Sequence, residues 1–221
     1  MIVLDDALNF LSTPRDYAYV VLSPSDFGQL VYNGQTVEAS KEGVVQYKAF
    51  LNELVAKLNP TGGFVSCIVT DRKYKGQILS RSTMMVNAFE EAGWKIHTKK
   101  IWAHTLKANL YRTTYTDVIT FCKGKYSANL VPGIRPDVWL VEEDADYKDE
   151  TAKHHGVIPR EILIRLIASY SKVGDIVLDP FAGTASTSEV SIQLNRKYLA
   201  VEIDPEMFAI AHERLNQTII T

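Results

Sequence analysis

The chain has 221 residues, 46% of them hydrophobic and 23% charged, with a formal net charge of −2. This length suits one well-buried domain over residues 1–221, and the composition is that of an ordinary globular protein. No apolar run approaches the roughly 20 residues of a membrane-spanning helix, and two cysteines, Cys67 and Cys122, make neither a zinc site nor a disulfide framework. The N-terminus lacks the basic start of a signal peptide, so we expect a cytoplasmic protein without membrane contact.

The first third of the chain alternates strand-like and helix-like patterns. Residues 17–22 form a short apolar run that ends in Ser23-Pro24, which is typical of a buried parallel strand. Apolar residues between 44 and 58 recur at the spacing of one helix face, and the glycine-containing turn at 59–63 ends that helix. Residues 64–70 are predicted to return as a strand.

The same alternation continues through the middle of the chain. We expect a helix near residues 79–91, ended by Gly93, and strands near 96–102 and 117–122. Residues 125–153 are predicted to be irregular, and the end of that segment is acidic.

The last third repeats the pattern in its clearest form. Pro159 is predicted to begin a helix that runs to about residue 171. The elements that follow are a strand, a helix, a strand and a helix, at residues 176–178, 184–194, 198–201 and 205–215. Alternation this regular predicts an α/β fold with a doubly wound, mostly parallel sheet and helices on both of its faces.

A glycine turn after the strand at 176–178 is the strongest candidate for a ligand site. Asp179 ends the strand, and the loop that follows reads Pro180-Phe181-Ala182-Gly183-Thr184. In open α/β sheets ligands bind outside the carboxyl ends of strands, where a glycine permits close approach of the backbone. Glu202 ends the next strand 23 residues after Asp179, at the spacing of a ribose-binding acid. The loop has neither GxGxxG nor GK[ST], so a nucleoside without phosphate fits it better than a nucleotide.

In these motifs the chain resembles the amino-methyltransferases of DNA, in the permuted order that places the catalytic motif before the cofactor motif. The resemblance runs nearly end to end. The family's cofactor motif is matched by residues 174–184 and its Arg-x-Tyr-x-Gly-x-Glu strand by 196–202. Its His-x-x-x-x-Pro helix start is matched from His154 to Pro159, and its Gly-Asp-Ala-Leu by Asp5-Asp6-Ala7-Leu8.

The resemblance implies S-adenosyl-L-methionine as the cofactor, and we expect no metal. It implies that Asp179, Phe181 and Gly183 shape the methionine and ribose pocket, that Glu202 holds the ribose hydroxyls, and that Asp6 lies near the adenine. The implied cofactor-binding residues are Asp6, His154, Asp179, Pro180, Phe181, Gly183, Thr184 and Glu202.

The family's catalytic turn, (Asp/Asn/Ser)-Pro-Pro-(Tyr/Phe/Trp), is matched only in part. The chain reads Ser23-Pro24-Ser25-Asp26-Phe27, so the second proline is missing and the aromatic residue comes one position late. In amino methylation a side-chain oxygen and a backbone carbonyl accept the two amino hydrogens while an aromatic ring stacks on the flipped base. Three alternatives stay open: Phe27 swings in and stacks, Asp26 takes over as hydrogen-bond acceptor, or the site is inactive.

The first residue of this turn also indicates which base is the target. A serine in its first position favours cytosine N4, as does the segment Asp71-Arg72, and the alternatives are adenine N6 and a base of RNA. A hypothesis of another class is a catalytically inactive, cofactor-binding subunit of a methyltransferase complex. A small-molecule methyltransferase is the third choice, which the basic residues described next make less attractive.

A basic stretch in the middle of the chain indicates a polyanionic partner. Residues 72–112 hold nine lysines and arginines against Glu90 and Glu91. We expect the partner to be DNA in preference to RNA. Residues 125–153 are too few for a large target-recognition domain, so we expect the DNA sequence to be recognised by this basic stretch, including Tyr111, by a homodimer mate or by a partner subunit. His97 and His104 are interpreted as surface or phosphate-contacting residues. The predicted nucleic-acid-binding residues are Arg72, Lys73, Lys75, Lys99, Lys100, Lys107 and Arg112.

Overall fold

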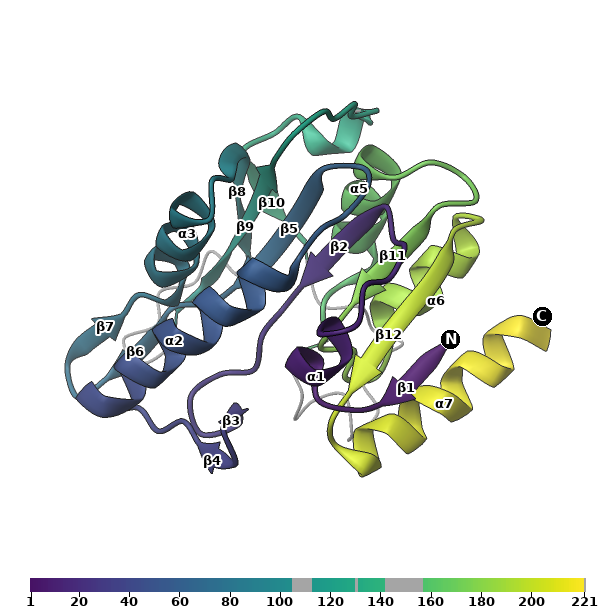
Figure 1. Ribbon diagram of the computed structural model, residues 1–221. Coiled ribbons are helices and arrows are strands. Elements are labelled where there is room, and N and C mark those ends of the chain that lie inside the picture. Colours follow the sequence, from purple (N-terminus) through teal and green to yellow (C-terminus); the bar gives the residue numbers. More distant parts are fainter. Residues whose placement is uncertain (105–112, 130, 142–156, 221) are drawn as a thin grey trace.

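The centre of the structure is an eight-stranded sheet (Figure 1). The computed structural model describes residues 1–104, 113–129, 131–141 and 157–220. The strands lie in the order β1-β12-β11-β2-β5-β9-β8-β10. Their bounds, in that order, are Ile2–Leu4, Lys197–Glu202, Ile176–Asp179, Tyr19–Leu22, Phe64–Val69, Tyr115–Cys122, Lys95–Ala103 and Val138–Leu140. β9 is antiparallel to both of its neighbours, and the other pairings in this sheet are parallel.

The two central strands are hydrophobic on both faces. All residues of β2 and β5 are buried, which is the pattern of a sheet covered by helices on both sides. Val20 of β2 lies opposite Leu178 of β11 and Val65 of β5. Because β11, β2 and β5 are parallel, the loops after them leave the sheet at one edge, which we call the carboxyl edge.

Helices cover both faces of the sheet (Figure 1). One face carries α1 (Ala7–Leu11), α2 (Lys41–Lys57) and α3 (Arg81–Glu91). The other face carries α5 (Arg160–Tyr170) and α6 (Ser186–Gln193), while α7 (Pro205–Ile220) packs against β1 and α6. Side chains of β2 point alternately to the two faces of the sheet. Val20 and Leu22 pack in the apolar cluster on the face with α2 and α3, and Tyr19 and Val21 pack in the cluster on the face with α5.

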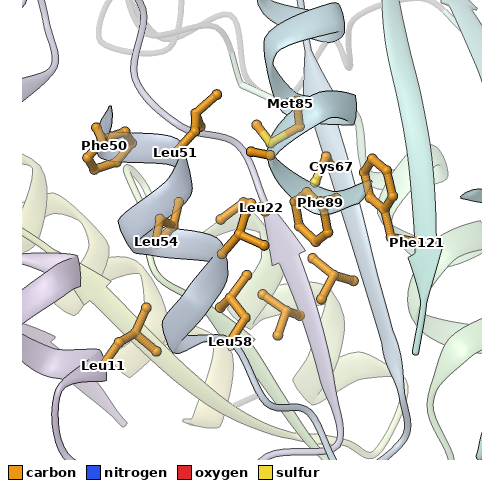
Figure 2. Packing of buried hydrophobic residues seen from close by; sticks show 14 of the residues in the cluster. Leu11, Leu22, Phe50, Leu51, Leu54, Leu58, Cys67, Met85, Phe89 and Phe121 are labelled. Carbon is orange, nitrogen blue, oxygen red and sulfur yellow. The ribbon is translucent and has the colours of Figure 1, made fainter. Parts of the chain in front are cut away.

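One of these apolar clusters lies beneath α2 and α3 (Figure 2). Leu51 and Leu54 of α2 pack here with Leu22 of β2, and Phe89 of α3 stacks on Phe121 of β9 with ring centroids 4.0 Å apart. Buried aromatic and aliphatic side chains of this size dominate the stability of a core. Their packing fixes α2 and α3 relative to the end of β2.

Two small hairpins lie outside the main sheet, β3 (Val31–Tyr32) with β4 (Gln35–Thr36) and β6 (Arg72–Tyr74) with β7 (Gln77–Leu79). The second hairpin was not predicted, and the helix predicted near residues 79–91 follows it as α3. Lys75 and Gly76 have φ of 49° and 76°, the left-handed pair that a tight hairpin turn requires, so the helix begins only at Arg81.

The sheet confirms the predicted α/β class with a mostly parallel sheet and helices on both faces. Within residues 125–153, which the sequence predicts to be irregular, the structure has a 3-10 turn (Pro132–Ile134) and β10, while 130 and 142–153 lie outside the described residues. None of the helices in the described part of the chain is long and apolar enough to cross a membrane.

Candidate active site

The loops after β2 and β11 leave the sheet side by side at its carboxyl edge. From β11 the sheet continues to β12, and from β2 it continues in the opposite direction to β5. The boundary between β11 and β2 is therefore a topological switch point, where open α/β sheets bind their ligands. This arrangement brings the predicted catalytic turn, residues 23–27, next to the predicted cofactor loop, residues 179–184.

Two carboxylates fix the cofactor loop. Asp179 is only 5% exposed and accepts a hydrogen bond from the Phe181 N–H at 3.0 Å. Glu202, at the end of the neighbouring strand, accepts one from the Gly183 N–H at 2.7 Å through Oε2. Gly183 has φ of +50°, where a Cβ is disfavoured, so glycine suits this turn. The structure thus joins the two acidic residues of the motif through the loop between them.

Burial raises the pKa of the Asp179 carboxyl from its ordinary value of 3.8 to about 6. Hydrogen bonds from Thr187 and Phe181 oppose that rise, and the negative charge of Glu202 adds to it. The carboxylate at the start of the loop is therefore held in an environment that disfavours its charge, which is the environment that a cationic ligand would relieve.

Asp6 lies at the same edge, one strand further out. β1 runs parallel to β12 with Leu4 opposite Glu202, and the Asp5 N–H donates to the Glu202 carbonyl at 3.0 Å. The Asp6 carboxylate caps α1 by accepting from the N–H groups of Leu8 and Asn9 at 2.9 and 3.0 Å. The structure thus places Asp6 near the end of β12, with one carboxylate oxygen engaged in the cap.

An ion-pair cluster that the sequence analysis missed supports the loop from behind. Arg214 of α7 donates to the carbonyl and the hydroxyl of Thr184 at 3.1 and 3.2 Å. Arg214 also pairs with Glu189 of α6, which in turn accepts from Arg160 of α5 at 2.9 Å. The cluster ties three helices to the loop through Thr184. Its members are far apart in the sequence, so no local pattern reveals them, and His154 lies outside the described residues.

The predicted catalytic turn follows β2 directly. Pro24 is buried and Ser23 is half-buried, and within the described residues the Ser23 hydroxyl makes no hydrogen bond. The backbone carbonyls of Pro24 and Ser25 both accept from Nη2 of Arg81, at 2.6 and 3.0 Å. The turn therefore keeps one acceptor hydroxyl unengaged, while its two carbonyls are held by a single guanidinium.

The packing of Phe27 argues against the first of the three alternatives, in which this ring swings in and stacks on the base. Its side chain is 1% exposed and packs on Tyr47 of α2 with ring centroids 4.9 Å apart. The physical reason is that the ring completes the apolar cluster beneath α2, so withdrawing it would leave a cavity. Asp26 is held as well, because its Oδ2 accepts from Arg72 at 3.1 Å and its Oδ1 lies 3.6 Å from Nη1 of Arg81.

The basic stretch does not form one cationic face. Lys100 is 7% exposed and pairs with Asp137 at 2.7 Å, which corrects its prediction as a nucleic-acid contact, because β8 turns this side chain inward. Lys99 is exposed but pairs with Asp117 at 3.3 Å. Lys73 and Lys75 are exposed on the β6–β7 hairpin. Two further predicted contacts and one selecting residue fall outside the described residues, namely Lys107, Arg112 and Tyr111.

His104 and His97 lie toward opposite edges of the sheet, and a hollow at the amino edge lies near His97. His104 shares a hydrogen bond of 2.8 Å with Thr116 at the carboxyl edge. His97 packs among Phe64, Tyr126 and Tyr170, and burial lowers its pKa. A hollow of about 450 Å³ lies near these aromatic rings, at the amino edge, so it does not coincide with the candidate site.

Known proteins resemble the chain in both sequence and structure. A family model described as DNA methylase matches residues 32–213. The orphan methyltransferase M.BamHII of Bacillus amyloliquefaciens is 26% identical over 74% of the chain and 78% of the relative. The DNA adenine methyltransferase YhdJ of Escherichia coli K12 is 37% identical over 41% of the chain, which spans 30% of that relative. A putative DNA modification methylase of Thermus thermophilus, solved with S-adenosyl-L-methionine, shares the fold, with a TM-score of 0.74, 22% identity and coverage of 99% of the chain and 93% of that protein.

Proposed function

The chain belongs to the DNA methylase family, amino-methyltransferases that use S-adenosyl-L-methionine, and from that premise we propose that it methylates the exocyclic N4 amino group of cytosine in DNA. One observation carries the proposal. The loops after β11 and β2, which are far apart in the sequence, meet at the switch point of the sheet. A methyl donor in the first loop and a base held by the second would therefore be neighbours, as direct transfer requires.

The chemistry of the cofactor loop fits S-adenosyl-L-methionine, which supplies an electrophilic methyl group on a sulfonium cation. The buried Asp179 carboxylate offers a negative counter-charge. Glu202 accepts three backbone hydrogen bonds, from Gly183, Ile203 and Asp204, and its carboxylate keeps an acceptor site for a ribose hydroxyl. The loop has no phosphate cradle, in keeping with a nucleoside that carries none.

The catalytic turn acts by orientation in this proposal, since amino methylation needs no covalent intermediate with the protein. The unengaged Ser23 hydroxyl accepts one amino hydrogen of the flipped base. The Ser25 carbonyl accepts the other through the lone pair that Arg81 leaves open. Drawing both hydrogens aside turns the nitrogen lone pair toward the methyl group. Asp26 does not serve as the acceptor, because Arg72 and Arg81 hold its carboxylate.

DNA reaches this turn across the β6–β7 hairpin. Arg72, the first residue of the hairpin, donates to Asp26 and to the Phe27 carbonyl, so the hairpin is anchored beside the turn. Lys73 and Lys75 lie on its exposed surface, where they would contact phosphates. We assign sequence selection to the hairpin together with a second copy of the chain or a partner subunit. We expect the protein to act in the cytoplasm, where its DNA substrate is found.

Product analysis tests the proposal. The chain is incubated with DNA or RNA and methyl-labelled S-adenosyl-L-methionine, and the labelled nucleosides are separated. We expect N4-methylcytosine from DNA, and none with Asp179→Ala, which removes the carboxylate at the start of the loop. N6-methyladenine would replace the proposal with the alternative that the likeness to the E. coli adenine methyltransferase favours. Methylation of RNA alone would move the substrate to RNA.

A second candidate, an inactive cofactor-binding subunit, is favoured by one observation. The aromatic ring that the turn retains is buried in the core, so Phe27 cannot stack on a base in this arrangement. This candidate predicts that S-adenosyl-L-methionine raises the melting temperature by mass action while no nucleoside is methylated, with or without the native partner.

A further inference from the structure

Arg81 has an environment that its sequence position does not predict. It is the first residue of α3, where the helix dipole disfavours a cation, yet it is 5% exposed. Its guanidinium donates four hydrogen bonds and forms one ion pair. Nη2 donates to the carbonyls of Pro24 and Ser25, Nη1 donates to the Thr70 carbonyl at 3.2 Å and faces Asp26, and Nε donates to the Tyr47 hydroxyl at 3.0 Å. Burying a guanidinium costs desolvation free energy even when all its hydrogen bonds are made, so we expect this placement of Arg81 to serve a function.

The contacts of Arg81 fall on the part of the turn that lacks a second proline. Pro24 fixes its own φ, but Ser25 stands at the position of the second proline and has no ring to fix its φ. The Arg81 guanidinium spans Ser25, because it donates to the Pro24 and Ser25 carbonyls on either side of that residue and pairs with the side chain of Asp26. We propose that Arg81 is the positioning residue of the turn, supplying through its guanidinium the rigidity that a second proline would give and so holding Ser23 toward the cofactor loop. This inference rests on the proposed function.

The position of Arg81 is itself determined by the end of β5. The Asp71 carboxylate, two residues after the end of that strand, accepts from the Ser82 N–H and from the Ser80 hydroxyl, both at 2.9 Å. Ser80 in turn caps α3. The first turn of the helix is thus fixed to the strand next to β2, and Arg81 reaches from there to the catalytic turn. Asp71 is a helix-capping carboxylate in this arrangement.

Asp26 is the counter-ion of this assembly. Its carboxylate lies between Arg81 and Arg72 and also accepts from the Phe27 N–H at 2.7 Å. Asp26, which stands at the family's aromatic position, therefore pairs with both arginines and links them to the turn. A lysine at position 81 would keep the charge but lose the planar fork that reaches two carbonyls at once.

The chain offers a matched control. Arg196 also uses a guanidinium fork on two backbone carbonyls, those of Leu194 and Ser171, at 2.6 and 2.8 Å. It precedes β12, at the amino edge of the sheet, away from the turn and the cofactor loop. Arg81→Lys and Arg196→Lys therefore remove the same type of interaction, one at the candidate site and one at the opposite edge.

The first experiment compares turnover, cofactor affinity and melting temperature in these two variants. We expect Arg81→Lys to lower kcat by about 10²-fold with the dissociation constant for S-adenosyl-L-methionine within about twofold of wild type, because misplacement of a reacting group by about 1 Å has that effect. Arg196→Lys should lower the melting temperature as much and kcat by less than about threefold. Equal loss of kcat in both variants, or a fall in kcat that only follows stability, contradicts the inference.

A second variant tests the comparison with proline directly. Within the described residues the Ser25 N–H donates no hydrogen bond that proline would remove. Ser25→Pro should recover at least about tenfold of the kcat lost in Arg81→Lys when the double variant is compared with Ser25→Pro alone, a non-additivity expected of residues that act on one element. Additive effects, or a double variant without recovery, contradict the inference.

Hydrogen exchange separates this inference from the proposed function. The amides of Phe27 and Gly28 are both hydrogen-bonded, to Asp26 and to the Val37 carbonyl, and report on the order of the turn without any turnover. Faster exchange of both in Arg81→Lys than in Arg196→Lys supports the positioning role, and equal exchange contradicts it. Absence of methyl transfer by the wild type would overturn the proposed function, and the exchange result would then decide the inference.

Discussion

Asp179→Asn should stabilise the free protein while weakening its cofactor site. Burial raises the pKa of Asp179 from 3.8 to about 6, so the folded chain binds this proton more tightly than the unfolded chain does. Between those two pH values the folded state holds more protons, and stability falls as pH rises through that window. A rise of roughly two pH units in the pKa corresponds to about 3 kcal/mol, which is the upper limit of what the buried charge costs above pH 6.

Urea denaturation without cofactor at several pH values measures this effect. The asparagine keeps an acceptor for the Phe181 N–H and removes the charge, so the variant should exceed wild type in stability by about 1–3 kcal/mol at pH 7. The difference should shrink as pH falls below 6 and vanish only well below the unfolded pKa of 3.8, where the wild-type carboxyl is protonated in both states. Asp175→Asn, at the amino edge, controls for the substitution itself.

Cofactor affinity should move in the opposite direction. Without the Asp179 charge, S-adenosyl-L-methionine should bind at least about tenfold more weakly, because a buried counter-charge near a sulfonium contributes several kcal/mol at close range. A variant that is less stable than wild type at pH 7 and binds the cofactor equally well would refute this account of the loop.

The other predictions concern the hairpin, the turn and the loop. Removing the charges of Lys73 and Lys75 should weaken DNA binding and reduce the slope of log affinity against log salt by about one per lysine. Lys100→Ala should instead lower the melting temperature and leave the slope unchanged, because the buried Lys100 side chain already donates to Asp137 and to the Arg135 carbonyl. Phe27→Ala should destabilise the fold by about 3–5 kcal/mol in urea denaturation, and a loss of turnover at full stability would mean that the ring serves the substrate. Gly183→Ala should cost about 1 kcal/mol, since its φ of +50° disfavours a Cβ even though no atom lies within 4 Å of one, and an unchanged melting temperature would show that the loop relaxes freely.

Much of the fold could be predicted from the sequence because its signals are local. The buried strands β2 and β5 appear as continuous apolar runs, and α2 shows the spacing of one buried face. The short elements could not be predicted in this way. β10 has three residues, and its pairing with β8 depends on neighbours that are distant in the chain. The β6–β7 hairpin gave no apolar alternation, and only Lys75-Gly76 marked its turn.

The site could be predicted where one motif holds it and not where side chains converge from several elements. The loop at Asp179 and the acid at Glu202 come from one strand–loop–helix–strand unit, and the structure joins them through Gly183. The burial of Phe27 and Lys100 could not be predicted, because it depends on the tertiary packing that surrounds each side chain. Arg81 counted only as one charge among nine, and only the folded chain brings it to the turn.

A comparison of Ser23→Ala with Ser25→Ala tests the central claim most directly. The claim is that the Ser23 hydroxyl orients the amino group beside the cofactor loop, while Ser25 contributes only its backbone carbonyl. Methyl transfer to DNA should fall by about 10²-fold or more in Ser23→Ala, the scale of losing one transition-state hydrogen bond, with cofactor affinity unchanged, and by less than about threefold in Ser25→Ala. Equal transfer by Ser23→Ala and wild type would contradict the claim that this turn is the catalytic element.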